Sequence, residues 1–211
     1  MPLRILAYRR IPNHGEAYFF AHDDSADEVV GATRRWLEKA VIGLELCPFA
    51  AAAYVARRVR FRVSAAESAA ALLGDLRAEL LWLYAQKPEA CETSLLIHPR
   101  FGTDFLDFND FLGECTALID ALGLEGELQI ASFHPHYQFA GTGPADIENY
   151  TNRSPYPTLH LLREASVARA VRSLADPAAI YRRNILTMRT LGSEGWRQLF
   201  APAADMHRDG E

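Results

Sequence analysis

Two histidines stand at the ends of segments that have the composition of buried β-strands, and a proline follows each of them. The first segment is Thr93 to His98, and the second is Glu127 to His134. The carboxyl ends of parallel strands meet at one edge of a sheet, and ligands bind at that edge in open α/β folds. We therefore expect the imidazoles of His98 and His134 to lie close together and to line a polar crevice.

Cys47 follows a predicted helix and lies outside any apolar stripe, so its thiol is available for chemistry. With His98 and His134 it would complete a Cys/His/His set of ligands for iron, zinc or manganese, to which Asp146 or Glu148 could add a carboxylate. Two other interpretations use the same thiol, as a nucleophile that takes either histidine as its base or as an axial ligand of haem. A small, buried apolar side chain is the alternative without chemistry.

The loop over 136–153 is rich in Gly, Pro, Asn and Thr, and it begins at the edge where His134 is expected. Loops of this length inside a domain are usually functional or mobile. The loop ends before a predicted helix, whose free N–H groups favour an anion, and an arginine can clamp a carboxylate or phosphate. We therefore expect a small anionic metabolite to be bound by Asn149, Tyr150, Asn152 and Arg153. The alternative is a plain helix cap with a solvated or ion-paired arginine.

Several of these segments together resemble one protein family. The matching stretches are Cys47 to Ala50, Thr93 to Pro99, Gln129 to Gly141 and Asn149 to Ser166. They are similar to a family of bacterial and plant proteins catalogued as domain of unknown function 1415, and the resemblance covers roughly residues 26–192. That family often has an acidic residue at the position of His136. The resemblance therefore implies a site with His98 and His134, and not a metal pair of His134 and His136.

Capping boxes predict the first two helices that position these residues. Ser25 with Glu28 opens a helix over 26–44, and Ser64 with Glu67 opens a second, long helix. Between the two helices, residues 58–63 alternate arginine with apolar side chains. That period of two predicts a strand with one face in water.

Caps also predict the remaining helices. Thr103 caps a third helix. Ser154, followed by proline, opens a helix that runs through Leu159 and Leu162 and beyond, and Asp176, followed by proline, opens a last helix that ends before Gly192. Strands that alternate with helices predict an α/β fold with a small, mainly parallel sheet layered with helices and a C-terminal pair of helices. A mixed sheet or an α+β, ferredoxin-like arrangement is the alternative.

Length and composition limit the class of protein. The 211 residues fit a single α/β domain over 26–200, with an arm or an extra strand at 1–25 and a flexible tail at 201–211. A net charge of −5 argues against nucleic-acid binding, and no apolar run approaches the ~18 residues of a membrane span. Three cysteines without framework spacing, in a chain without a signal peptide, predict reduced thiols in the cytoplasm.

Together these features predict a small-molecule enzyme whose crevice is built from Cys47, His98, His134 and the loop over 136–153. We expect a metal-dependent hydrolase or oxidoreductase that acts on an anionic metabolite. One alternative is an enzyme in which Cys47 is the nucleophile and a histidine is its base. Another is a protein without catalytic activity that binds a metabolite or haem.

Overall fold

A computed structural model describes residues 25–172, 176 and 178–201. The predicted N-terminal arm, apart from Ser25, and the predicted tail after Ala201 lie outside these residues. None of the helices in the described ranges combines the length and the apolar character that crossing a membrane requires.

The centre of the molecule is a four-stranded sheet of mixed direction. Its strands are β1 (Val59–Val63), β2 (Thr93–Ile97), β3 (Leu128–Phe133) and β4 (Thr158–Arg163), in the order β1-β2-β4-β3. β1 and β2 are parallel, while β4 is antiparallel to both of its neighbours, β2 and β3. Consequently β1, β2 and β3 all run in one direction, and their carboxyl ends share one edge. The predicted α/β class with a small layered sheet is confirmed, in its mixed form.

The strand β4 corrects one sequence prediction, because Ser154 does not open a helix through Leu159. The Ser154 hydroxyl donates instead to the carbonyl of Tyr156, at 2.6 Å. Thr158 to Arg163 then pair with both β2 and β3. Without this strand, β3 would lose its partner strand in the described sheet and β2 would lose its partners on one side, which outweighs the local helix signal. The helix that follows, α5 (Glu164–Arg172), begins only after the strand ends.

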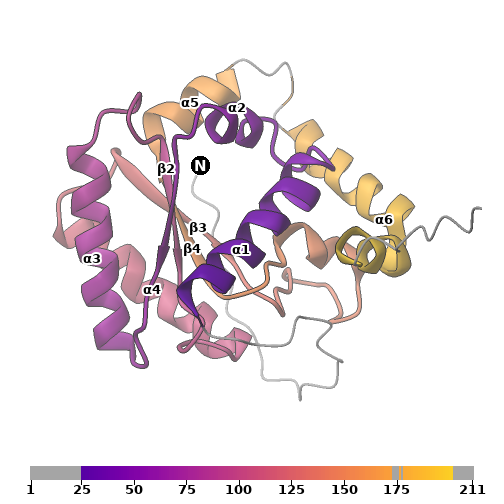
Figure 1. Cartoon of the computed structure of the whole chain (residues 1–211), viewed down its shortest axis with the longest axis horizontal. Helices are drawn as coiled ribbons and strands as arrows, with labels where there is room; N and C mark the ends of the chain where they lie inside the picture. Colours follow the sequence, from indigo (N-terminus) through magenta and orange to yellow (C-terminus); the bar gives the residue numbers. More distant parts are fainter. Residues whose placement is uncertain (1–24, 173–175, 177, 202–211) are drawn as a thin grey trace, which may run out of the picture.

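Helices α3 (Ala69–Ala85) and α4 (Phe105–Ala121) cover one face of the sheet (Figure 1). They enclose the larger hydrophobic core, to which the strands contribute Leu96, Leu128, Leu159 and Leu161. The caps of both helices differ from the prediction. Ser68, not Ser64, caps α3 by accepting the amide of Ala71, and Asp104, not Thr103, caps α4.

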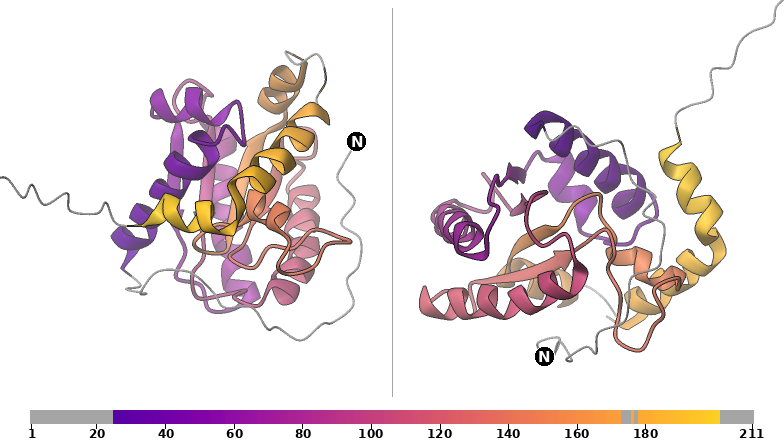
Figure 2. Two further views of the ribbon diagram at one scale, coloured as in Figure 1. Left: turned by 90° about the vertical axis from the view of Figure 1, so that its right-hand side faces the viewer. Right: turned by 90° about the horizontal axis from the view of Figure 1, so that it is seen from below.

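The opposite face is covered by α1 (Ala26–Trp36), the π-helical turn η1 (Leu37–Ile42), the short α2 (Ala50–Val55) and α6 (Ala178–Phe200). Trp36, Met188 and Trp196 lie at the centre of their core. The predicted cap of α1 is confirmed, since the Ser25 hydroxyl accepts from the amide of Glu28. α6 changes direction at Gly192, where φ is 66°, and packs on the 3-10 turn η2 (Ile147–Asn152), as Figure 2 shows.

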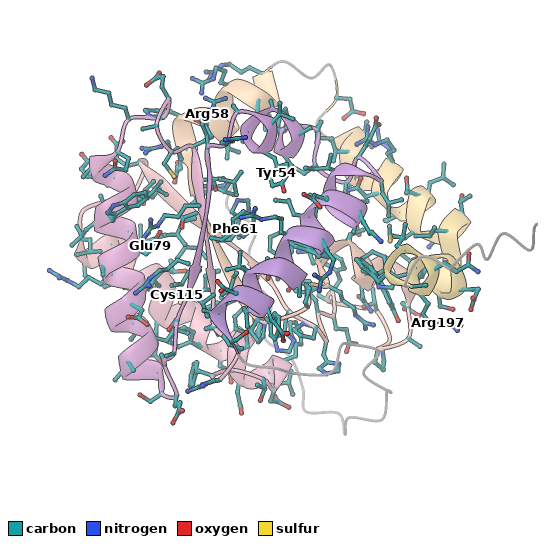
Figure 3. The ribbon with its side chains drawn as sticks, in the orientation of Figure 1. Tyr54, Arg58, Phe61, Glu79, Cys115 and Arg197 are labelled. Atoms are coloured by element: carbon teal, nitrogen blue, oxygen red, sulfur yellow. The ribbon has the colours of Figure 1, made fainter. Side chains whose placement is uncertain are left out.

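The arginine face of β1 lies toward α3, which covers it only in part, since Arg62 is exposed. Arg60 donates to Glu79 of α3 at 2.8 Å and stacks on Trp82, with its guanidinium carbon 4.0 Å from the ring centre. Figure 3 shows Glu79 between α3 and the sheet, and Phe61 on the side that faces α1. The alternation of β1 therefore separates an apolar face under α1 from an arginine face that is partly covered, where the carboxylate of Glu79 compensates the charge of Arg60.

Candidate functional site at the carboxyl edge of the sheet

The two predicted histidines both lie at the carboxyl edge of the sheet, where they share one aromatic neighbour. His98 follows β2 and His134 follows β3, and both rings contact Phe108 of α4. The ring centres are 5.5 Å from Phe108 for His98 and 5.2 Å for His134. The parallel direction of β2 and β3 explains this placement, although the first residues of β4 lie between the two strand ends.

Both nitrogens of His134 are engaged by the backbone. Nε2 donates to the carbonyl of Gly102 at 3.0 Å, and Nδ1 accepts the amide of His136 at 3.0 Å. The side chain is fully buried, and burial lowers the pKa of His134 to about 3. The imidazole is therefore neutral at physiological pH, and its one lone pair is occupied by an N–H group.

His98 is held in a similar way but keeps one free nitrogen. Its Nδ1 lies 2.9 Å from the carbonyl of Phe101 and donates to it, because a carbonyl can only accept. Nε2 is completely buried and has no hydrogen-bond partner within the described residues. Burial lowers the pKa of His98 to about 4, so this imidazole is also neutral.

The structure does not bring Cys47 to the two histidines. Cys47 packs in the cluster of Trp36, on the face covered by α1 and α6. His98 and His134 contact Phe108, which belongs to the core under α3 and α4, on the opposite face. Among the described residues, no group of three or more His, Cys, Asp or Glu side chains could hold a metal ion. The iron, zinc or manganese site stays a prediction from sequence.

Asn149, predicted to contact substrate, uses its whole amide group to shape the loop. Its Oδ1 accepts the amide of Phe139 at 2.9 Å and the hydroxyl of Thr142 at 2.8 Å. Its Nδ2 donates to the carbonyl of Gly143, also at 2.8 Å. The side chain is fully buried. Asn149 thus fixes the positions of the residues around it.

Asn152 and Tyr150 also hold the loop in place. Asn152 donates from Nδ2 to the carbonyl of Ser132 at 3.4 Å, and the Tyr137 hydroxyl shares hydrogen bonds with the side chains of Ser132 and Asn152. Tyr150 meets Trp196 of α6 edge-on, with ring centres 5.3 Å apart. These contacts tie the loop to β3 on one side and to α6 on the other.

Arg153 is oriented by three contacts, none of which neutralises its charge. Nε donates to the carbonyl of Tyr137 at 3.3 Å, and Nη2 donates to the carbonyl of Pro144 at 2.7 Å. The guanidinium carbon lies 4.2 Å from the centre of the Tyr150 ring. No carboxylate forms an ion pair with Arg153 in the described part of the chain.

The positive charge of Arg153 acts on the imidazole of His136. Burial and then the positive charge of Arg153 lower the pKa of His136, while Asp104 acts in the opposite direction. The carboxylate of Asp104 already accepts the amides of Leu106 and Asp107 as the cap of α4. The edge therefore combines an unpaired cation with a neutral imidazole. The family resemblance argued against a metal-binding role for His136. The only feature of the sequence that indicated a functional role for His136 was its position two residues after His134.

The comparisons with known proteins identify a family and no individual relative. The family model described as protein of unknown function (DUF1415) matches residues 28–198. No curated protein and no solved structure matches the chain.

Proposed function

The chain belongs to the family described as protein of unknown function (DUF1415), and from its own geometry we propose that it binds a small anionic metabolite beside β3, with Arg153 as the charged contact. One observation carries the proposal: a partly buried guanidinium is held in a fixed orientation without any carboxylate from the described residues. Burial already lowers the pKa of Arg153, which reflects the cost of its uncompensated charge.

An anion would compensate that charge. Carboxylate and phosphate groups match the donor geometry of a guanidinium, and hydrogen bonds between ionised groups are the stronger ones. Arg153 is already fixed by two carbonyls and by the ring of Tyr150, so little side-chain entropy remains to be lost on binding. The geometry therefore favours an anion of low molecular weight, with one carboxylate or phosphate against Arg153.

We further propose that the site belongs to a small-molecule enzyme in which His136 transfers a proton. A neutral imidazole beside the anion site can accept a proton from a bound molecule, and the negative charge of that molecule favours the protonated form. This role is supported more directly than metal-dependent hydrolysis or oxidation, because backbone groups engage both nitrogens of His134. The alternative with Cys47 as nucleophile lacks support, since no contact joins Cys47 to either histidine.

The binding proposal is tested with sulfate and inorganic phosphate, by calorimetry and by amide chemical shifts. The change Arg153→Met keeps most of the side-chain volume and removes the charge, and it should weaken binding by roughly tenfold or more. Arg189→Met is the matched control, because Arg189 of α6 is already paired with Glu148. Equal affinities in the wild type and in Arg153→Met would remove the proposed site.

A further inference from the structure

A second polar feature lies in the middle of the sheet, on the face that α1 covers. His160 is the third residue of β4. Strand pairing aligns Phe61, Leu95, His160 and Ala131 in one row across the four strands. The two neighbours of His160 along the strand, Leu159 and Leu161, are fully buried on the opposite face, under α3 and α4. An imidazole in an apolar row of an interior strand calls for a specific partner.

One of its nitrogens has such a partner, and that partner fixes the tautomer. His160 Nε2 lies 2.8 Å from the hydroxyl of Thr93 on β2. The same hydroxyl lies 2.5 Å from the carbonyl of Leu161, which can only accept, so the single hydroxyl proton points there. His160 Nε2 must therefore carry a proton and donate to Thr93. In the neutral ring, Nδ1 is then left with a lone pair.

Within the described residues, that lone pair has no donor and is not completely enclosed. Among the described residues, His160 Nδ1 has no hydrogen-bond partner. The completely buried side-chain nitrogens without a partner belong to Arg58 and His98, so His160 Nδ1 is partly accessible. His160, Ala131 and Gln129 all keep part of their surface exposed although both faces of the sheet carry helices. The described helices thus leave this part of the face incompletely covered.

We propose that His160 Nδ1 is the acceptor of a second ligand site on this face, which takes an uncharged aromatic ring that bears an O–H or N–H donor. The proposal does not rest on the anion site, since His160 contacts Thr93 and Phe133 whereas Arg153 contacts Tyr137, Pro144 and Tyr150. The polar contact of this site is a neutral acceptor, and Phe133 supplies an aromatic neighbour.

The surroundings of His160 select this class of ligand. The ring of Phe133 lies 6.0 Å from that of His160, and the adjacent position in the row is Ala131, a small residue that, like His160, is partly exposed. Burial alone lowers the pKa of His160 to about 4, and no charged group contributes to that shift. Arg34 lies over Phe61, at the far end of the row, about two strand spacings away. A charged ligand would lose its hydration next to His160 without compensation.

The test compares phenol with toluene, two probes of nearly the same shape of which only phenol can donate. Titration of the protein labelled with nitrogen-15 should shift the Nδ1 resonance of His160 with phenol and leave it unchanged with toluene. Phenol should bind at least severalfold more tightly than toluene. A phenol titration that leaves this resonance unmoved would overturn the proposal without any variant.

Two variants separate ligand binding from a purely structural link between β2 and β4. His160→Phe should abolish the preference for phenol over toluene, whereas Arg153→Met should preserve it while losing sulfate binding. Ala131→Leu places a larger side chain beside His160 and leaves its bond to Thr93 in place, so it should abolish phenol binding in a folded protein even if His160→Phe fails to fold. Persistence of the phenol preference in either His160→Phe or Ala131→Leu would contradict the proposal.

Discussion

Glu79 of α3 accepts both the guanidinium of Arg60, at 2.8 Å, and the hydroxyl of Ser94, at 2.6 Å, and so joins the helix to two strands. The Glu79 side chain is only 5% exposed, while that of Arg60 is 37% exposed. The carboxylate therefore stabilises a buried hydroxyl and a cation that partly reaches water.

Replacement of Glu79 should destabilise the fold through Ser94 more than through Arg60. Glu79→Ala leaves the buried hydroxyl of Ser94 without an acceptor, which costs about 1–3 kcal/mol, and adds a cavity beneath α3. The control is Glu67→Ala, because Glu67 pairs with Arg100 while 74% exposed and should contribute less than about 1 kcal/mol. Urea unfolding measures both, and equal losses would contradict this account of the pair.

Two buried histidines, His98 and His134, and the half-buried His160 should make the protein sensitive to mild acid. Burial lowers the pKa to about 4 for His98, about 3 for His134 and about 4 for His160. In the unfolded chain each would titrate near pH 6.5, so the unfolded state binds more protons between these values. The free energy of unfolding should therefore be fully present above about pH 6.5 and decrease as the pH falls toward 4.

The measurement is urea unfolding at a series of pH values between about 5 and 7, above the range in which most carboxylates titrate. The slope of the free energy of unfolding against pH is proportional to the number of protons taken up on unfolding, and each of these imidazoles contributes up to one proton. His98→Gln and His160→Gln should therefore each lower that number by up to one. A stability that does not change over this range would mean that these rings take up protons without unfolding.

The local parts of the fold could be predicted from sequence because their causes are local. Ser25 caps α1 as its spacing to Glu28 indicates, and the strand that ends before His98 is read from its apolar run and the following proline. The position of β4 could not be predicted in this way. Ser154 followed by proline is a helix signal, and the strand exists because it pairs with β2 and β3, which are distant in the sequence.

The same limit explains how far the candidate site could be predicted. The placement of His98 and His134 at one edge follows from strand direction, and the structure has that placement. Their backbone partners, Phe101 and Gly102, depend on how the turn before α4 folds, and no sequence period indicates that. His160 was missed because its segment was predicted as a helix. The alternation of Leu159, His160 and Leu161 was the available signal for a strand.

Asn149 should control the order of the loop more than the stability of the whole protein. Asn149→Ala removes an acceptor for the amide of Phe139 and for the hydroxyl of Thr142, as well as the donor to Gly143. Three hydrogen bonds of about 1 kcal/mol each correspond to a large loss of local protection. Hydrogen exchange at the Phe139 amide should accelerate by about 100-fold. Exchange unchanged from the wild type would show that the loop is held by other contacts.

Anion binding next to His136 should strengthen as the pH falls. In the free protein, burial and the charge of Arg153 lower the pKa of His136, so the ring is neutral at pH 7. A bound anion compensates Arg153 and stabilises the protonated ring, which raises the pKa of His136 in the complex. Binding is then coupled to proton uptake, and the affinity for sulfate should rise severalfold between pH 8 and 6. Sulfate is the suitable probe because its own charge is constant in this range.

The change His136→Gln separates this effect from the general charge of the protein. It keeps a polar side chain and removes the titrating group, so the affinity for sulfate should become nearly independent of pH and should match that of the wild type at high pH. Arg153→Met, in contrast, should bind sulfate weakly at every pH. A pH dependence that survives in His136→Gln would assign the proton uptake to another group. An affinity that falls toward low pH in the wild type would contradict the proposed pairing of His136 with the anion.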